Sequence, residues 1–185
     1  AIRNGSLGRK AKPYLPSSAL LGIPKPQGGT RPLAAGEVLY RMGACWGLDE
    51  VQRTAADLLL KANQYAIGIP GGVETAARLV DTFLSGTADM GDLLALLVVD
   101  VSNAFNECPR ELVLSRLFER PELSAIWRIV HWAYSEPFDL WVIARGQIAG
   151  HLMSSQGVKQ GDPLAAPLLP RCTPSVQGLS RYCQP

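Results

Sequence analysis

The feature that most constrains the fold is an apolar run near the middle of the chain. Residues 93–101 read LLALLVVDV, with no polar side chain before Asp100. Because the run has no polar face, it needs cover on both sides, either as a strand inside a sheet or as part of a buried helix. Its short length and its two adjacent valines favour a strand. We therefore expect Asp100 to emerge where a buried strand ends.

Helical periodicity precedes this run. Apolar residues recur at helical spacing in residues 36–62, where Gly47 to Asp49 predict either a break between two helices or a bend in one. Residues 73–84 carry a second helical stripe, which the following serine-glycine pair should end.

Further helices are predicted after the apolar run. Pro109 stands where a first helical turn accepts a proline, and the apolar spacing after it predicts a helix. Another helix is predicted over residues 122–134. An Asp-Pro pair at residues 162–163 should open a short helix, within which Pro167 would remove a backbone hydrogen bond at a cost of roughly 3 kcal/mol.

Extended structure is predicted in two places. Residues 24–32, PKPQGGTRP, are restricted to turns and short extended pieces, and they predict a loop or hairpin that presents basic side chains. Residues 138–143 and 147–152 are joined by Ala-Arg-Gly and predict a β-hairpin. Helices and hairpins together indicate a mixed α and β fold.

Charge is divided unevenly along the chain. Residues 1–41 carry seven basic side chains against Glu37 alone, although the whole chain has a net charge of only +2, so the remainder is net acidic by four. A basic leading segment on an acidic body indicates contact with a polyanion, such as nucleic acid or a triphosphate. For residues 1–12 alone, a solvated basic tail is the favoured interpretation.

Cysteine and histidine usage argues against a metal or disulfide framework. The four cysteines lack paired metal spacing, which fits a reducing compartment, and His131 and His151 are each isolated in the sequence. The longest aliphatic run is too short to span a bilayer, and the first residues lack an apolar signal core. We expect a soluble intracellular protein that makes no membrane contact.

Three separated segments carry a more specific signal. In chain order they are PKPQGGTRPL at 24–33, DVSNAF at 100–105 and SQGVKQGDPL at 155–164. A basic loop, an aspartate followed by an aromatic residue, and a glutamine-glycine turn in this order resemble the reverse transcriptases of non-LTR retrotransposons, which are also similar to group II intron and telomerase enzymes. The resemblance covers about residues 21–169. It implies an α+β fold, the fingers and partial palm of a right-hand polymerase, with helices packed on a small, mainly antiparallel sheet.

The resemblance also implies an activity, RNA-directed DNA polymerisation with two Mg²⁺ ions, acting on an RNA template, a DNA primer and deoxynucleoside triphosphates. Asp100 matches the palm aspartate that bridges both ions, and the carbonyl of Val101 is a further expected ligand. Phe105 matches the aromatic residue that lies under the incoming sugar and excludes a 2′-hydroxyl. Without Asp100 and the glutamine turn, a core aromatic would be the ordinary explanation of Phe105.

Further nucleotide contacts are expected in the other two segments. Lys25 and Arg31 match the fingers residues that grip the triphosphate, which ammonium and guanidinium groups complement. Gln160 and Gly161 match the turn that packs beside the incoming nucleotide and the templating base, where glycine lets backbone approach closely. Lys159 is expected to contact template phosphate.

One element of the family pattern is missing. The pair of adjacent aspartates that completes the metal site does not occur among the 185 residues. Asp100 alone cannot hold two closely spaced divalent ions, so we expect a truncated, inactive piece of a polymerase. The alternatives are a noncatalytic RNA-binding or interaction remnant, and a nonfunctional pseudogene product that scarcely folds.

The expected organisation has three parts. Residues 1–20 form a flexible basic segment, residues 21–169 the fingers and partial palm, and residues 170–185, which are rich in proline, a disordered or aberrant tail. Nuclear residence follows only from how such retroelements integrate, and the oligomeric state is left open.

Overall fold

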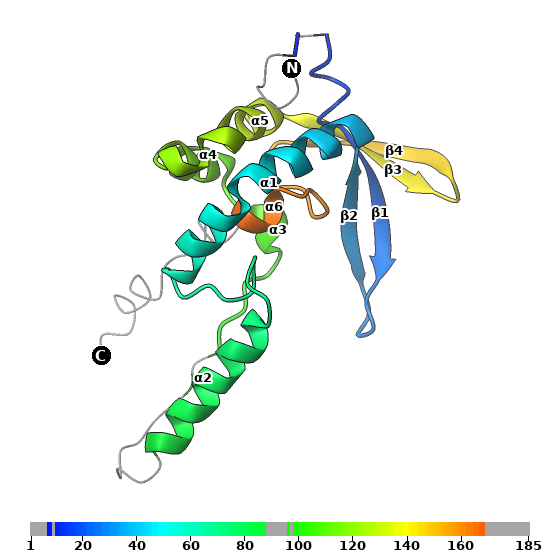
Figure 1. Cartoon of the computed structure of the whole chain (residues 1–185). Helices are drawn as coiled ribbons and strands as arrows, with labels where there is room; N and C mark the ends of the chain where they lie inside the picture. The colour runs from blue at the N-terminus through cyan, green and yellow to red at the C-terminus, as the bar shows by residue number, and fades with distance from the viewer. Residues whose placement is uncertain (1–6, 9, 88–95, 97, 169–185) are drawn as a thin grey trace, which may run out of the picture. The chain divides into compact units, whose positions relative to one another are not determined.

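The chain divides into two compact units, each described by itself. A computed structural model describes residues 7–8, 10–87, 96 and 98–168 (Figure 1). The larger unit comprises Ala1–Val51 and Asn103–Pro185, and the smaller unit comprises Gln52–Ser102. None of the described helices is long and apolar enough to cross a membrane.

The larger unit is built on a four-stranded sheet in the order β2-β1-β3-β4. The strands are β1 (Ser18–Pro24), β2 (Thr30–Gly36), β3 (Phe138–Ala144) and β4 (Gln147–Ser154). Two antiparallel hairpins, β1–β2 and β3–β4, are joined side by side by a parallel pairing of β1 with β3. The first strand begins inside the segment that was predicted to be a flexible leader, so its last residues belong to the sheet.

Both predicted hairpins are confirmed, and turn residues explain them. Arg145 and Gly146 have φ values of 51° and 74°, and two successive positive φ values match the twist of a tight antiparallel turn. Between β1 and β2, Gly28 and Gly29 have φ values of 88° and 83°, and the Lys25 amide donates to the Gly29 carbonyl over 3.1 Å. The basic loop is therefore the tip of a hairpin (Figure 1).

The first helix, α1 (Val38–Leu60), is continuous, so the alternative of two helices with a break at Gly47 is wrong. A Cβ added to Gly47 would lie 3.4 Å from Cγ2 of Ile126, which belongs to α5 (Ser124–Tyr134). The missing side chain lets the two helices approach each other, and a glycine used for packing looks the same in sequence as a glycine that ends a helix.

The other helices of the larger unit complete its core. They are α3 (Ala104–Glu107), α4 (Arg110–Phe118), the 3₁₀ turn η2 (Pro121–Leu123), α5 and α6 (Ala165–Leu168), and they confirm the helices predicted after residue 109 and over residues 122–134. The short helix predicted to open at residues 162–163 begins instead at Ala165, so the buried Pro167 lies in its first turn and removes no hydrogen bond within it. The reason is position, because amide groups of a first helical turn have no partner within the helix.

The smaller unit contains α2 (Gly72–Thr87), which confirms the second helical stripe. The strand predicted over residues 93–101 is not found among its described residues. Leu96, Val98 and Val99 have no regular secondary structure and are 58%, 81% and 58% exposed, while residues 93–95 and 97 lie outside the described part. An apolar strand needs paired neighbours and cover on both faces, and no described strand pairs with this run.

Candidate functional site

One loop of the larger unit contacts two segments that are distant from it in the sequence. We call residues 155–161 the glutamine loop. The amide of Ala34 in β2 donates to the Gln160 carbonyl over 2.8 Å, which ties this loop to the basic hairpin. The amide of Val158 donates to the Phe105 carbonyl over 2.7 Å, which ties it to α3. Three segments far apart in the sequence are thus brought together.

Two glycines permit these close approaches. Gly157 has a φ of 72°, and an added Cβ would lie only 2.2 Å from the Asn106 carbonyl oxygen. Gly161 has a φ of 116°, and its added Cβ would lie 2.9 Å from the Ala34 carbonyl oxygen. Any side chain at either position would collide with backbone and strain the loop. The expectation that Gly161 allows a close backbone approach therefore describes contact with the protein's own β2.

A buried carboxylate anchors the end of the loop. Asp162 Oδ2 accepts hydrogen bonds from the hydroxyls of Tyr40, at 2.7 Å, and Tyr134, at 2.5 Å. Asp162 Oδ1 accepts from the Leu164 amide at 2.9 Å. The ammonium of Lys159 lies 3.8 Å from Oδ2, and both side chains of this pair are almost fully buried. Helix α1, helix α5 and the loop are thereby joined through one carboxylate.

A buried guanidinium holds the beginning of the loop. Arg110, the first residue of α4, donates to the carbonyls of Gly157 at 2.7 Å, Ser154 at 3.0 Å and Gln156 at 3.2 Å. It also donates to the Ser154 hydroxyl at 2.7 Å, and its guanidinium lies over the Phe138 ring, 4.6 Å from the centroid. Five planar donors suit this ring of carbonyls, so a single side chain fixes the loop backbone.

Burial shifts the proton affinities in this network. Desolvation, followed by the charge of Asp162, raises the pKa of the Tyr40 and Tyr134 hydroxyls well above their usual value. Desolvation lowers the pKa of Lys159 to about 8, although Asp162 opposes the change, and it lowers the pKa of Arg110 as well. The tyrosines therefore remain neutral donors to Asp162.

This placement corrects the prediction for Lys159. Its ammonium donates to the Pro16 carbonyl over 3.0 Å and lies over the Tyr40 ring, 4.2 Å from the centroid. With a side chain only 2% exposed, Lys159 offers no charge to a template phosphate. Its role is internal, because it pairs with Asp162 beneath the loop.

The basic side chains of the hairpin are placed differently. Lys25 and Arg31 are exposed at the tip and at the adjoining end of β2, and neither makes an ion pair with another described residue. Exposed cations on a hairpin tip are available to an anionic ligand. Their expected contact with a triphosphate stays a prediction.

The remaining expected nucleotide contacts are partly covered. Phe105 in α3 and Gln160 in the loop are both half-buried, whereas Gly161 is exposed. A cavity of about 40 Å³ lies between α3, the sheet and the loop, and Gln160 is among the residues that line it. A space this small has room for water but not for a nucleotide, so the predicted contacts require the outer surface of the loop.

The predicted metal ligands belong to the other unit. Asp100 and Val101 are exposed, and the Val101 amide donates to Asp100 Oδ1 over 2.9 Å. Within the described residues, no three His, Cys, Asp or Glu side chains are grouped so that they could hold a metal ion. The described part of the chain therefore does not fit a two-magnesium centre.

Sequence reasoning missed the buried network. Tyr40, Arg110, Tyr134 and Asp162 were not singled out, and Asp162 was read only as the residue that opens a helix. The available signal was the unusual string KQGDP, which places two opposite charges around a glycine turn. Burial of both charges depends on helices more than 20 residues away and was not visible in that string.

Comparison with known proteins gives one informative result. No protein-family model matches the chain. Over 168 residues, 91% of this chain, the sequence is 24% identical to the retrotransposable element SLACS 132 kDa protein of Trypanosoma brucei gambiense, and the match spans 13% of the length of that protein. The chain is a distant homologue of part of a retrotransposon protein.

Proposed function

We propose that this chain is a fingers and partial palm segment of an RNA-directed DNA polymerase from a non-LTR retrotransposon, and that it binds RNA but does not extend a primer by itself. The observation that carries the proposal is the alignment of 91% of the chain with a retrotransposable element protein. The match spans only 13% of that protein. Polymerase activity of a longer protein that contains this segment is therefore also a proposal.

The geometry of the larger unit supports a role in nucleic-acid binding. The hairpin tip carries the exposed Lys25 and Arg31, and the Ala34–Gln160 bond fixes the glutamine loop beside the same hairpin. Exposed cations on a hairpin tip suit a phosphate backbone, whose binding is driven by release of counterions. Gln160 would then contact a base or sugar, and Phe105 would restrict the sugar from below.

Salt-dependent RNA binding tests the role of the hairpin. For a fluorescently labelled single-stranded RNA, we expect the Lys25→Ala/Arg31→Ala variant to bind more weakly, with the slope of log affinity against log salt reduced by about 1.4 if each residue neutralises one phosphate. The charge-matched control is Lys61→Ala/Arg78→Ala, which removes two exposed cations from the smaller unit. Equal slopes for wild type and the hairpin variant would exclude phosphate contacts by Lys25 and Arg31.

Primer extension distinguishes this proposal from a complete polymerase. The assay uses an RNA template, a DNA primer, magnesium and deoxynucleotides, with Asp100→Ala as the control. We expect no extension, because the described residues group no set of three metal-ligating side chains. Extension that vanishes with Asp100→Ala would overturn the inactive assignment and establish the polymerase.

A noncatalytic RNA-binding module is the second candidate. Two observations favour it. The basic hairpin surface is present, whereas the described residues contain no group of three metal-ligating side chains around Asp100. Magnesium-dependent binding of a deoxynucleoside triphosphate separates the two candidates, since only a polymerase segment is expected to show it. Cooperative thermal unfolding of the chain would exclude a product that does not fold.

A further inference from the structure

The two outer strands of the described sheet, β2 and β4, have different free edges. An outer strand turns every second amide and carbonyl away from its sheet, where another strand can pair with them. In the first hairpin the Lys25 amide bonds Gly29 across the turn, whereas the Ala34 amide turns away from β1 and bonds Gln160. Even-numbered residues of β2 therefore face outward. Because Ala34 is covered by the glutamine loop and Pro32 has no amide to donate, the edge of β2 is closed.

The same alternation shows which backbone groups of β4 face outward. Odd-numbered residues of β1 bond β2, so Ser18 and Leu20 direct their backbone groups toward β3. Trp141 lies between the partners of these two residues and takes up their bonds, as parallel pairing requires. The residues on either side of Trp141 are left to bond β4. On β4 the alternation then leaves His151 and Met153 with amides and carbonyls that point away from the sheet.

The outer edge of β4 lacks the features that close such edges in other proteins. The strand contains no proline and no acidic or basic residue apart from its histidine, and both Leu152 and Met153 are more than half exposed. In the part of the chain that the structure describes, no backbone group bonds the outward groups of His151 and Met153. A bulge opposite Val142 confines the regular edge to residues 150–154. This short edge is open to another strand.

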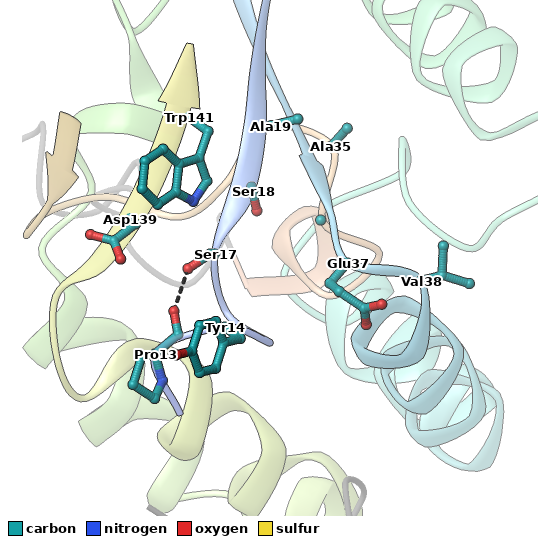
Figure 2. A pocket seen from close by; sticks show the side chains of 11 residues that line it. Pro13, Tyr14, Ser17, Ser18, Ala19, Ala35, Glu37, Val38, Asp139 and Trp141 are labelled. Atoms are coloured by element: carbon teal, nitrogen blue, oxygen red, sulfur yellow. Dashed lines mark hydrogen bonds between the residues drawn. The ribbon is translucent and has the colours of Figure 1, made fainter. Parts of the chain in front are cut away.

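The histidine of this edge already has a partner for its charge. Its Nε2 lies 2.7 Å from Oδ1 of Asp139, and its ring centroid lies 4.8 Å from that of Trp141. Both partners belong to β3 and are shown in Figure 2. An identical strand can therefore approach without bringing unpaired like charges together. An acidic or a basic peptide would find no opposite charge along the strand itself.

We propose that two copies of this chain associate by antiparallel pairing of their β4 strands into one continuous sheet. The two-fold register that uses every outward group of the regular edge sets His151 opposite Met153 of the second copy, and places Leu152 opposite its own counterpart. Leucine then occupies the closer, non-hydrogen-bonded position. One strand from each copy is less than the roughly 800 Å² per partner of stable complexes, so we expect a dissociation constant of about 10–100 µM. This association is separate from RNA contact at the hairpin tip.

Sedimentation velocity of the full chain between about 5 and 500 µM tests the association. We expect growth from monomer to dimer and no further, because the closed edge of β2 prevents extension of the sheet. Leu152→Lys places like charges opposite each other and should weaken the dimer by at least about tenfold, with the melting temperature changed by less than about 3 °C because the side chain is exposed. Met42→Lys, on the exposed surface of α1, is the matched control and should dimerise as wild type does. A monomer throughout this range, growth beyond a dimer, or equal effects of the two lysines would overturn the proposal.

Disulfide cross-linking tests the register. In a Cys45→Ser background, which removes one exposed thiol, Leu152→Cys should bring two Cα atoms to about 4.5 Å, within the range of a disulfide. Gly150→Cys is the control, because its Cβ meets Val142 only at an ordinary 3.8 Å, yet in this register its counterpart lies about 14 Å away. Under mild oxidation we expect at least about fivefold more covalent dimer from Leu152→Cys than from the control or the background. Equal yields from the two cysteine variants, or none above the background, would overturn the pairing.

Discussion

Substitution of the buried carboxylate Asp162 by asparagine should destabilise the larger unit severely. Both carboxylate oxygens are acceptors, Oδ1 for the Leu164 amide and Oδ2 for two tyrosine hydroxyls. An amide has only one acceptor oxygen, so whichever way it turns, its NH₂ group faces a donor. The change also removes the negative charge 3.8 Å from the Lys159 ammonium, whose side chain is 2% exposed.

The size of the effect follows from these two losses. A buried donor left without an acceptor costs about 1–3 kcal/mol, and breaking a buried ion pair from one side costs about 3–5 kcal/mol. The two costs do not simply add, because Lys159 can release its proton once the charge of Asp162 is removed. We therefore expect the free energy of unfolding to fall by about 3–5 kcal/mol at pH 7. Urea unfolding followed by tryptophan fluorescence measures it. The control Asp81→Asn, on the exposed surface of α2, should change stability by less than about 0.5 kcal/mol.

A second substitution tests whether the charges of Lys159 and Asp162 interact. Lys159→Met removes the cation but leaves Asp162 with its tyrosine and amide donors, so it should cost less than Asp162→Asn. In the double variant no charge is left unpaired, and the total loss should be smaller than the sum of the two single losses by at least about 1 kcal/mol. Losses that add within about 0.5 kcal/mol would refute the claim that the two charges interact.

Two more predictions concern the same region. Since folding lowers the pKa of Lys159 from 10.5 to about 8, the unfolded chain binds more protons between these values, and stability should rise by up to about 3 kcal/mol as pH increases from 8 toward 10. Above pH 10 stability should fall again, because the buried tyrosines keep their protons while unfolded tyrosines lose theirs. Melting temperatures across pH 7–11 show both limbs, and Lys159→Met should lack the rise; a rise that persists in that variant would assign it to another group. Gly157→Ala should cost more than about 2 kcal/mol in urea unfolding, because its Cβ would lie 2.2 Å from the Asn106 carbonyl oxygen, whereas Gly86→Ala, with nothing within 4 Å, should cost nothing; equal effects would mean that the loop adapts.

Local chemistry made part of the fold predictable. The β3–β4 hairpin was predictable because the Ala-Arg-Gly linker matches a tight turn, and the structure has positive φ at Arg145 and Gly146. The helices around residues 110–134 were predictable from a first-turn proline and regular apolar spacing. Each of these signals lies within the element that it predicts.

Predictions that depended on distant partners were less successful. Gly47 was interpreted as a break or a bend because its contact with Ile126, 79 positions later, was not visible in the sequence. Lys159 was read as a surface cation because lysine is rarely buried, and its burial depends on Pro16 and Tyr40. The apolar run before Asp100 is the opposite case. Its sequence predicts a buried strand, but its described residues are exposed and no described strand pairs with them.

The parallel pairing of β1 with β3 has a consequence for synthesis on the ribosome. Ser18 pairs with Leu140, so the first hairpin leaves the ribosome long before the strand that covers its edge. Each hairpin forms from local contacts, but closure of the sheet waits for a contact between residues more than a hundred positions apart, which slows folding. Until then the free edge of β1 can pair with another chain. Newly made copies at high concentration should therefore aggregate through this edge, and slower expression should give a larger soluble yield.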